Sequence, residues 1–447
     1  MFYTTFPKIA TRSYIMTKIK VSNFNELKTA IDYGAQYIII TRSFLSLQSI
    51  TLPPSVQLLG QAQENGAFPS ISFSHSDGFA ITCNNHIHNL VIQAPSEHRA
   101  IYNITADEHL GTFEFSNLTL SGQFSFIARS GVKNARINVN NLDIIAANTC
   151  HYLEQPQKYG VNVLQGAFTV YNFNSDADSL IELNIEGLTI GRENAPVIGS
   201  GMFISGFGDQ GGRVLSNKII TQAVYSNGKI PYGVANLITA AIFVVYGAEV
   251  KELVHEGDIV TYGVNDMVLD TWGSVENWLI KRNVISYGPS GVGFVNFGYV
   301  KKFIVEGAVE TYGLGARGYN QYDGTVDHIE FQSITTYGDG SVGIQISKKI
   351  GKLTVHGDVH THGGIGNSLV KGLNVTLPAI PLSIKEGGDV EEINIGGNIE
   401  SNGNDIVSYQ VDTGIVRAFN LKGKVLATGK NSQTVVILNG GQTPEII

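Results

Sequence analysis

The sequence predicts an all-β fold, a right-handed, single-stranded parallel β-helix with a short N-terminal helical cap. The main observation is a tripeptide of Thr or Ser, then Tyr or His, then Gly, which recurs at a constant interval: 261–263, 286–288, 311–313, 336–338 and 361–363. A constant period in this range indicates units stacked in a row. β-Branched residues and short apolar runs precede each copy, and glycines separate the runs, which is typical of strands joined by tight turns. Since no run within a unit is long and regular enough for a helix, each unit is predicted to be a coil of short strands.

The N-terminal element is predicted to be a cap over about 18–34, made of a strand and a short helix. Asn23 and Glu26 form a capping box, with Asn at the N-cap and Glu at the third helical position. Gly34 ends the helix, and three apolar residues before it share one helical face: Phe24, Leu27 and Ile31. This cap is expected to cover the open apolar end of the first coil, which otherwise invites edge-to-edge association.

One domain over 16–447 is predicted, after a poorly determined extension over 1–15, with Met1 or Met16 as the true start. The register of the regular copies extends along most of the chain, and its expected buried anchors are Leu90, Leu118, Leu142, Leu188, Val224, Ile259, Val284, Val309, Ile334, Val359, Ile399 and Val425. Most anchors follow one another at or close to the interval of the tripeptide. The longer intervals predict segments inserted into coils at about 147–175, 191–213, 229–241 and 364–384, and the whole array predicts about 12 or more coils.

A leucine-rich horseshoe is the alternative solenoid with this period. Its spacing fits residues 275–285 but fails at 300–310, and the glycine-rich, aromatic segment 289–299 does not suit the helical part of such a repeat. The constant coil length, the Asn and aromatic columns and the turn glycines instead resemble the right-handed parallel β-helix superfamily, often called pectin-lyase-like, over about 35–440. The catalytic signatures of its polygalacturonases (N-T-D, D-D, G-H-G and R-I-K) are not found here as a set, so the resemblance implies a fold and no particular activity.

Composition restricts the partners. The chain has 447 residues, of which 43% are hydrophobic and 15% charged, and a net charge of −8. Without a cluster of Lys and Arg, nucleic acid is not an expected partner. The two cysteines make no disulfide framework, and no apolar run is long enough to indicate a membrane span. Because no secretory signal is seen either, we expect a cytoplasmic or non-classically exported protein.

Several motifs that resemble ligand sites are interpreted as structural. Two G-x-G-x-x-G segments, at 313–318 and 338–343, are separated by one repeat interval and each precedes another strand, so they are turn glycines and not a dinucleotide site. His356, His360 and His362 are interpreted as a polar ladder. The histidines of the first coils, including His86 and His88, are expected to be surface or turn residues, so no metal and no cofactor are predicted.

The candidate binding site is an aromatic stripe on one face of the regular coils. Trp272, Phe297 and Tyr322 follow one another at the repeat interval, and Asp270, Asn320 and Gln345 belong to a column two residues earlier. If the residues between these columns point inward, strand alternation turns both columns outward. Such a stripe suits the stacking of sugar rings, with amides and carboxylates for the hydroxyls. The alternative is that an inserted segment packs over the stripe. The column of Tyr262 and its equivalents in the later copies is either a turn ladder or a second platform for sugars.

The leading hypothesis is a carbohydrate-active enzyme that acts on a polysaccharide as a lyase, hydrolase or epimerase. Asp266, Asp270 and Asp323 are the candidate acids and bases, and Arg317 is the candidate base or charge neutraliser. The alternative is a non-catalytic β-helix, which binds glycans or serves as an adhesive or phage-tail-like structure. The expected partner is a polysaccharide or oligosaccharide, and assembly into a homo-oligomer stays open.

Overall fold

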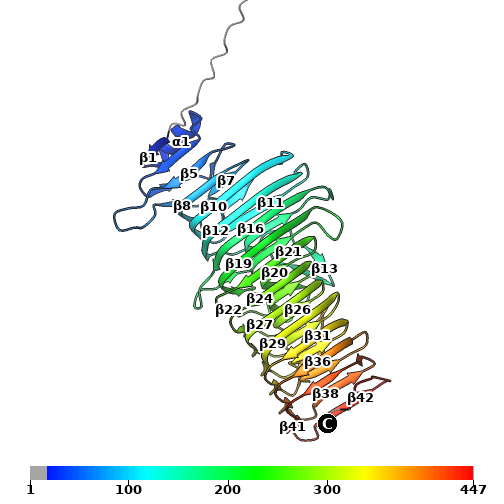
Figure 1. The fold of residues 1–447 in the computed structure, drawn as a ribbon. Helices are drawn as coiled ribbons and strands as arrows, with labels where there is room; N and C mark the ends of the chain where they lie inside the picture. Colours follow the sequence, from blue (N-terminus) through cyan, green and yellow to red (C-terminus); the bar gives the residue numbers. More distant parts are fainter. Residues whose placement is uncertain (1–17, 446–447) are drawn as a thin grey trace, which may run out of the picture.

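The structure, a computed structural model that describes residues 18–445, is a parallel β-helix with one short helix at its N-terminal end (Figure 1). The predicted extension over 1–15 lies outside the described residues. The strands stack in chain order along one axis, from β1 beside α1 to β42 at the opposite end (Figure 1). No helix among residues 18–445 is long and apolar enough to cross a membrane. The predicted fold class is confirmed.

Two long parallel sheets make up the coils. Where the first sheet turns, a coil has either a bend within one long strand or a break between two short strands. The first sheet has 24 strands: β1 (Lys18–Val21), β2 (Tyr37–Ile40), β3 (Phe44–Ser46), β5 (Gln57–Gly60), β6 (Ser70–Phe73), β8 (His86–Gln93), β10 (His109–Ser121), β12 (Asn134–Ala146), β16 (Leu180–Ile190), β17 (Val197–Ile198), β19 (Arg213–Asn227), β21 (Ala248–His255), β22 (Ile259–Thr261), β24 (Ser274–Ile280), β25 (Val284–Ser286), β27 (Tyr299–Thr311), β29 (Thr325–Thr336), β31 (Lys349–Val355), β32 (Val359–Thr361), β36 (Asp389–Ile395), β37 (Ile399–Ser401), β39 (Ile415–Val416), β40 (Phe419–Leu421) and β41 (Val425–Ala427).

The second sheet has 16 strands, of which fourteen follow one another in chain order: β4 (Ile50–Thr51), β7 (Phe79–Ile81), β9 (Arg99–Asn103), β11 (Gln123–Ala128), β15 (Gly166–Asn172), β18 (Ser200–Ser205), β20 (Leu237–Val244), β23 (Asp266–Thr271), β26 (Val292–Asn296), β28 (Arg317–Gln321), β30 (Ile344–Ile346), β35 (Leu382–Ile384), β38 (Val407–Asp412) and β42 (Gln433–Leu438). A regular coil, such as β24, β25 and β26, contributes two strands to the first sheet and one to the second. These fourteen successive strands agree with the prediction of about 12 or more coils.

The anchor residues of the regular copies form one buried column. Ile259, Val284, Val309, Ile334 and Val359 pair in register from strand to strand, and each is fully buried. Parallel strands of successive coils lie about 4.8 Å apart, so equivalent residues stack directly on one another. The constant spacing in the sequence is therefore the result of this stacking, and the predicted column is confirmed.

The predicted register is wrong at one junction, between β16 and β19. Leu188 and Val224 were expected in the same column, but Leu188 pairs with Thr221 and Val224 pairs with Ile190. The ladder between these strands contains several register shifts. The long interval between the two expected anchors therefore has two causes, an inserted segment and shifts in the strand ladder. The spacing in the sequence does not distinguish between them.

Asparagines at the bend of the first sheet form a side-chain ladder. Asn89, Asn117 and Asn141 have positive φ angles of 57°, 50° and 54°, which Asn tolerates better than most residues. The Asn117 amide donates to Asn89 Oδ1 at 2.9 Å, and the Asn141 amide donates to Asn117 Oδ1 at 3.0 Å. Each bend is therefore stabilised by the bend in the neighbouring coil.

The N-terminal cap has the predicted form. Helix α1 (Phe24–Asp32) begins after Asn23, whose side chain accepts a hydrogen bond from the Glu26 backbone N–H at 3.0 Å. The Glu26 carboxylate reaches the backbone N–H of Ser22 rather than that of Asn23, so the box closes one residue earlier than expected. Leu27 is fully buried against the first coils, with Phe24 and Ile31 partly buried beside it.

Two inserted hairpins leave the regular coils. They are β13 (Gln157–Lys158) with β14 (Val161–Val163), and β33 (Ile365–Val370) with β34 (Leu373–Pro378). Each of the four predicted insertions is too long at its C-terminal end, because each also includes residues of a regular strand of the second sheet, namely β15, β18, β20 or β35. These strands are largely buried and apolar, so the local pattern there was already that of a coil.

Candidate functional site

The predicted aromatic stripe lies on the outer face of the second sheet, but it is not an open platform. Trp272 and Tyr322 are only 4% and 7% exposed, and Phe297 is partly buried. Alternation does turn these side chains away from the coil interior, where Leu269 and Phe294 are buried. The expectation of an open face is wrong because the two inserted hairpins cover it. Residues of both hairpins, including Val161, Val163 and Leu369, join the stripe in a second apolar cluster outside the coils.

Aromatic rings from the stripe and from the first hairpin pack closely. The Tyr159 ring stacks on Phe297 with centroids 4.2 Å apart and meets Trp272 edge-on at 5.4 Å. Phe297 and Tyr322 are stacked at 5.1 Å. From the second hairpin, Lys371 Nζ lies 5.3 Å from the centroid of the Tyr322 ring, within the range of a cation–π contact.

The tips of the two hairpins meet above these rings. A Cβ on Gly160 would lie 3.0 Å from the Lys371 carbonyl oxygen, and one on Gly372 would lie 2.8 Å from the Gly160 carbonyl oxygen. Both glycines have positive φ angles, 84° and 78°, which other residues seldom adopt. Glycine is therefore needed at both tips, for the turn and for the close approach.

A small cavity of about 40 Å³ remains beneath the hairpins, and we refer to it as the covered pocket. Five predicted site residues line it: Asp270, Trp272, Phe297, Arg317 and Tyr322. Tyr159, Leu369 and Lys371 of the hairpins line it from above. The structure thus brings together five of the nine residues that the sequence proposed, beneath two covering hairpins.

Asp270 is the most unusual group in the covered pocket. Its side chain is fully buried, and neither carboxyl oxygen has a hydrogen-bond partner among the described residues. Burial raises the pKa of Asp270 well above its usual value, only partly opposed by the nearby Trp272 indole N–H and Thr271 backbone N–H, which do not reach hydrogen-bonding geometry. The environment therefore favours the protonated acid, which is a hydrogen-bond donor.

Arg317 fastens the second hairpin to the coils. Its guanidinium is 2% exposed, and Nη2 donates to Ser368 Oγ at 2.5 Å and to the Leu369 carbonyl at 2.8 Å. Ser368 Oγ in turn donates to the Gly315 carbonyl at 2.6 Å. This arginine was expected as a base or a charge neutraliser; its observed contacts hold the hairpin in place.

Other polar groups around the covered pocket also lack partners among residues 18–445. On the pocket lining they are the Tyr322 hydroxyl, the Trp272 indole N–H and Arg317 Nε; both side-chain polar atoms of Asn320, which is not part of the lining, are also buried without a partner. Gln345 is 6% exposed and pairs in register with Asn320 on the neighbouring strand. So many unpaired polar groups in one region are unusual, because each typically costs about 1–3 kcal/mol when buried.

The other two candidate acids do not line the covered pocket. The buried Asp266 carboxylate accepts hydrogen bonds from the Gly228 and Gly263 backbones and from Thr239 Oγ1, which makes it an anchor for two turns. Burial raises the pKa of Asp266 to about 6 against these hydrogen bonds. The Asp323 carboxylate is partly exposed, 3.7 Å from Lys348 Nζ. The predicted carboxylates therefore do not form a facing pair across this pocket.

The tyrosine column is a ladder whose ring faces contact one another. Tyr262, Tyr287, Tyr312, Tyr337 and His362 stack with centroids 4.6–5.6 Å apart and with nearly parallel planes. Tyr287, Tyr312 and Tyr337 are 39–47% exposed, and each has another ring stacked on both of its faces. Because sugars stack on ring faces, this geometry favours the turn-ladder interpretation over the platform.

Comparisons with known proteins do not assign this chain to a family. No protein-family model, no curated protein and no solved structure matches this chain. The resemblance to pectin-lyase-like proteins therefore holds at the level of a parallel β-solenoid, which the all-parallel sheets with sequential strand order show directly.

Proposed function

We propose that this protein binds a carbohydrate in the covered pocket. The observation that carries this proposal is the group of unpartnered polar atoms beside a wall of aromatic rings. A binding site for a small molecule is typically apolar and aromatic with a few placed polar groups. A sugar ring offers both parts of the complement, because its C–H faces pack on aromatic rings and its hydroxyls pair with amides, acids and guanidinium groups.

Access requires the hairpins to separate. A cavity of about 40 Å³ holds little more than a water molecule, so the closed arrangement excludes a sugar ring. The covering segments meet through backbone contacts at Gly160 and Gly372 and through the aromatic contacts of Tyr159. In this proposal the hairpins act as a lid, and the ligand takes the place of their contacts with Trp272 and Phe297.

The charged side chains that line the covered pocket restrict the class of sugar that it can bind. The covered pocket contains two cationic side chains, Arg317 and Lys371, and one carboxyl group, Asp270, whose environment raises its pKa and favours the neutral form. This balance favours neutral sugars and sugar acids over amino sugars with a free ammonium group. Uronic-acid oligosaccharides are therefore the first ligands to test.

The test is a glycan array with the full chain, followed by calorimetric titration of the best ligand. Trp272→Ala should weaken binding about tenfold, the effect expected for loss of one stacking contact of about 1.4 kcal/mol. The matched control is Tyr312→Ala, which removes an aromatic ring from the exposed ladder of the first sheet and should leave affinity unchanged. Failure of the wild type to bind any glycan, or equal loss in both variants, contradicts the proposal.

A second candidate function is catalysis with Asp270 as general acid. The favouring observations are its place in the pocket lining and its raised pKa, because a carboxyl group that keeps its proton above the usual pH range can donate it to a leaving group. Asp270→Asn keeps the shape of the side chain and removes the transferable proton. It should abolish the release of reducing sugar while retaining binding. If the wild type binds glycans but releases no product from any of them, the protein is a non-catalytic binding solenoid.

A further inference from the structure

A second group of side chains with ligand character lies on the outer face of the first sheet. His86 and His88 are two residues apart on β8, so both point to the same face. Glu114 on the neighbouring strand β10 pairs in register with His86. One ligand atom from each of the three side chains lies within 4.8 Å of the other two, and His86 Nδ1 is 3.8 Å from Glu114 Oε2. Among residues 18–445, this is the one group of three such side chains that converges in this way.

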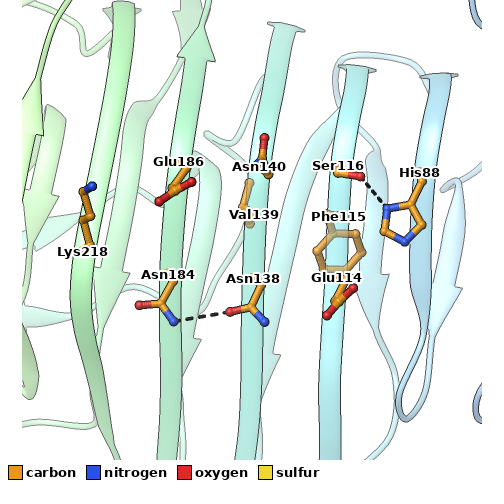
Figure 2. A pocket seen from close by; sticks show the side chains of 10 residues that line it. All are labelled: His88, Glu114, Phe115, Ser116, Asn138, Val139, Asn140, Asn184, Glu186 and Lys218. Atoms are coloured by element: carbon orange, nitrogen blue, oxygen red, sulfur yellow. Dashed lines mark hydrogen bonds between the residues drawn. The ribbon is translucent and has the colours of Figure 1, made fainter.

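A neighbouring hydroxyl fixes the orientation of one ring. His88 Nδ1 lies 2.5 Å from Ser116 Oγ on the adjacent strand, as Figure 2 shows. In the tautomer in which Nδ1–H donates to Ser116, Nε2 carries a free lone pair. Metal-bound histidines commonly have this arrangement, with a second hydrogen bond that sets the tautomer.

We propose that His86, His88 and Glu114 bind a divalent transition-metal ion, with Zn²⁺ as the reference ion. Two imidazoles and one carboxylate are a donor set that suits such ions. With metal–ligand bonds of about 2.0–2.1 Å, two ligands of a tetrahedral ion lie about 3.3–3.4 Å apart. The observed separations, up to 4.8 Å, therefore need adjustments of about an ångström, which partly exposed side chains can make.

The fourth coordination position faces an open hollow of about 370 Å³ (Figure 2). His88 and Glu114 line its first end, and polar residues of the next three strands line the rest: Asn138, Asn140, Asn184, Glu186 and Lys218. The Asn184 amide donates to Asn138 Oδ1 at 3.3 Å, so part of this lining is an ordered ladder. With three protein ligands and an open position, the ion can take a water molecule or an oxygen atom of a ligand in the hollow.

The metal site is independent of the proposed carbohydrate site. It lies on the first sheet, whereas the covered pocket lies on the second, and the two share no lining residue. Loss of metal binding and loss of glycan binding are therefore separable results. The sequence did contain a signal for the site, because Glu114 follows His86 at the same interval at which the anchor Leu118 follows Leu90.

The experiment is a titration of the metal-free full chain with Zn²⁺ by calorimetry and with Co²⁺ by absorption spectroscopy. The expected result is one tight site per chain and the intense visible bands of tetrahedral Co²⁺. His88→Ala and Glu114→Gln should each weaken binding about 100-fold or more, and Ser116→Ala about tenfold, because outer partners contribute about 10–100-fold. Binding should also weaken on acidification, because protons compete with the metal ion for its ligand atoms.

The matched control is His109→Ala, at the start of the same strand as Glu114 but outside the group. The His109 ring is hydrogen-bonded to the Asn134 side-chain amide at 2.8 Å. Removal of this ring should leave the affinity for the metal unchanged. Circular dichroism of each variant checks that the coils remain folded. The proposal is overturned if the wild type takes up no stoichiometric metal, or if His88→Ala and His109→Ala bind Zn²⁺ equally well.

Discussion

The unpartnered carboxyl group of Asp270 makes a sharp prediction about stability: Asp270→Leu should stabilise the protein, and increasingly so as pH rises. The group is fully buried, and its two oxygens have no hydrogen-bond partner among the described residues. Leucine has a similar length and suits the surrounding apolar cluster. Removal of a buried, unsatisfied polar group should by itself stabilise the fold by about 1–3 kcal/mol.

The pH dependence follows from the direction of the pKa shift. Burial raises the pKa of Asp270 above its usual 3.8, so over a range of pH the folded protein keeps a proton that the unfolded chain releases. The associated stability is fully present below pH 3.8 and decreases as pH rises, by about 1.4 kcal/mol per pH unit, until the folded pKa is passed. The Leu variant has no carboxyl group to titrate, so its stability does not decrease in this way. The difference in free energy of unfolding between the variant and the wild type should therefore grow by about 1.4 kcal/mol per pH unit.

The measurement is denaturant unfolding of both proteins at several pH values from 4 upward, compared as a difference. Other titrating groups, such as Asp266, contribute equally to both proteins and cancel. Asp270→Asn should remove the pH-dependent part without the gain at low pH, since it keeps a polar group. Asp323→Asn, at a partly exposed carboxylate outside the covered pocket, is the control and should change neither part. A difference that stays constant with pH, or a Leu variant that is less stable at every pH, refutes this account of the site.

Three further results are expected. Val309→Asp places a charge in the fully buried column and should lower the free energy of unfolding by several kcal/mol. Tyr312→Ala loses two ring contacts on the surface and should lower it by about 1–2 kcal/mol. Equal losses of stability in thermal melts of the two variants contradict the assignment of Val309 to the inside and Tyr312 to the outside. Asn117→Ala removes two rungs of the ladder at a positive φ and should destabilise by about 1–3 kcal/mol in urea unfolding, with Asn117→Gly less affected. Arg317→Ala removes the hydrogen bonds that fasten the second hairpin, so proteases should cut within 365–378 faster while the circular dichroism of the coils is retained; an unchanged rate argues against this fastening role.

The sequence predicted the parts of the fold that repeat. Ile259 and Val309 belong to one buried column because in-register parallel stacking puts the same residue type at the same place in every coil. The prediction failed at Leu188, which was expected to pair with Val224 and pairs with Thr221, because the strand ladder is irregular there. Pairing across the other long intervals was predicted correctly, as for Leu142 with Leu188 and Val359 with Ile399, because there the ladder beside the insertion is regular.

The sequence named five of the residues that line the covered pocket, but not the hairpins that cover them. Alternation correctly turned Asp270 and Trp272 away from the coil interior, since that depends only on neighbouring residues. Their burial depends on Tyr159 and Leu369, which are distant in the sequence on either side and belong to no repeat. The proposed metal-binding group did not stand out in the sequence for a different reason. Its three members lie on two strands, and only the coil interval relates Glu114 to the histidines.

The meeting of the hairpin tips at Gly160 and Gly372 has a consequence for how the protein unfolds. In a solenoid each coil contacts only its neighbours, so unravelling can begin anywhere and spread step by step. Here a contact joins two segments that are far apart in the sequence, across several intervening coils. Those coils are held in a closed loop and should lose structure as one cooperative block in hydrogen exchange. The C-terminal coils beyond the second hairpin lie outside that loop and can fray first.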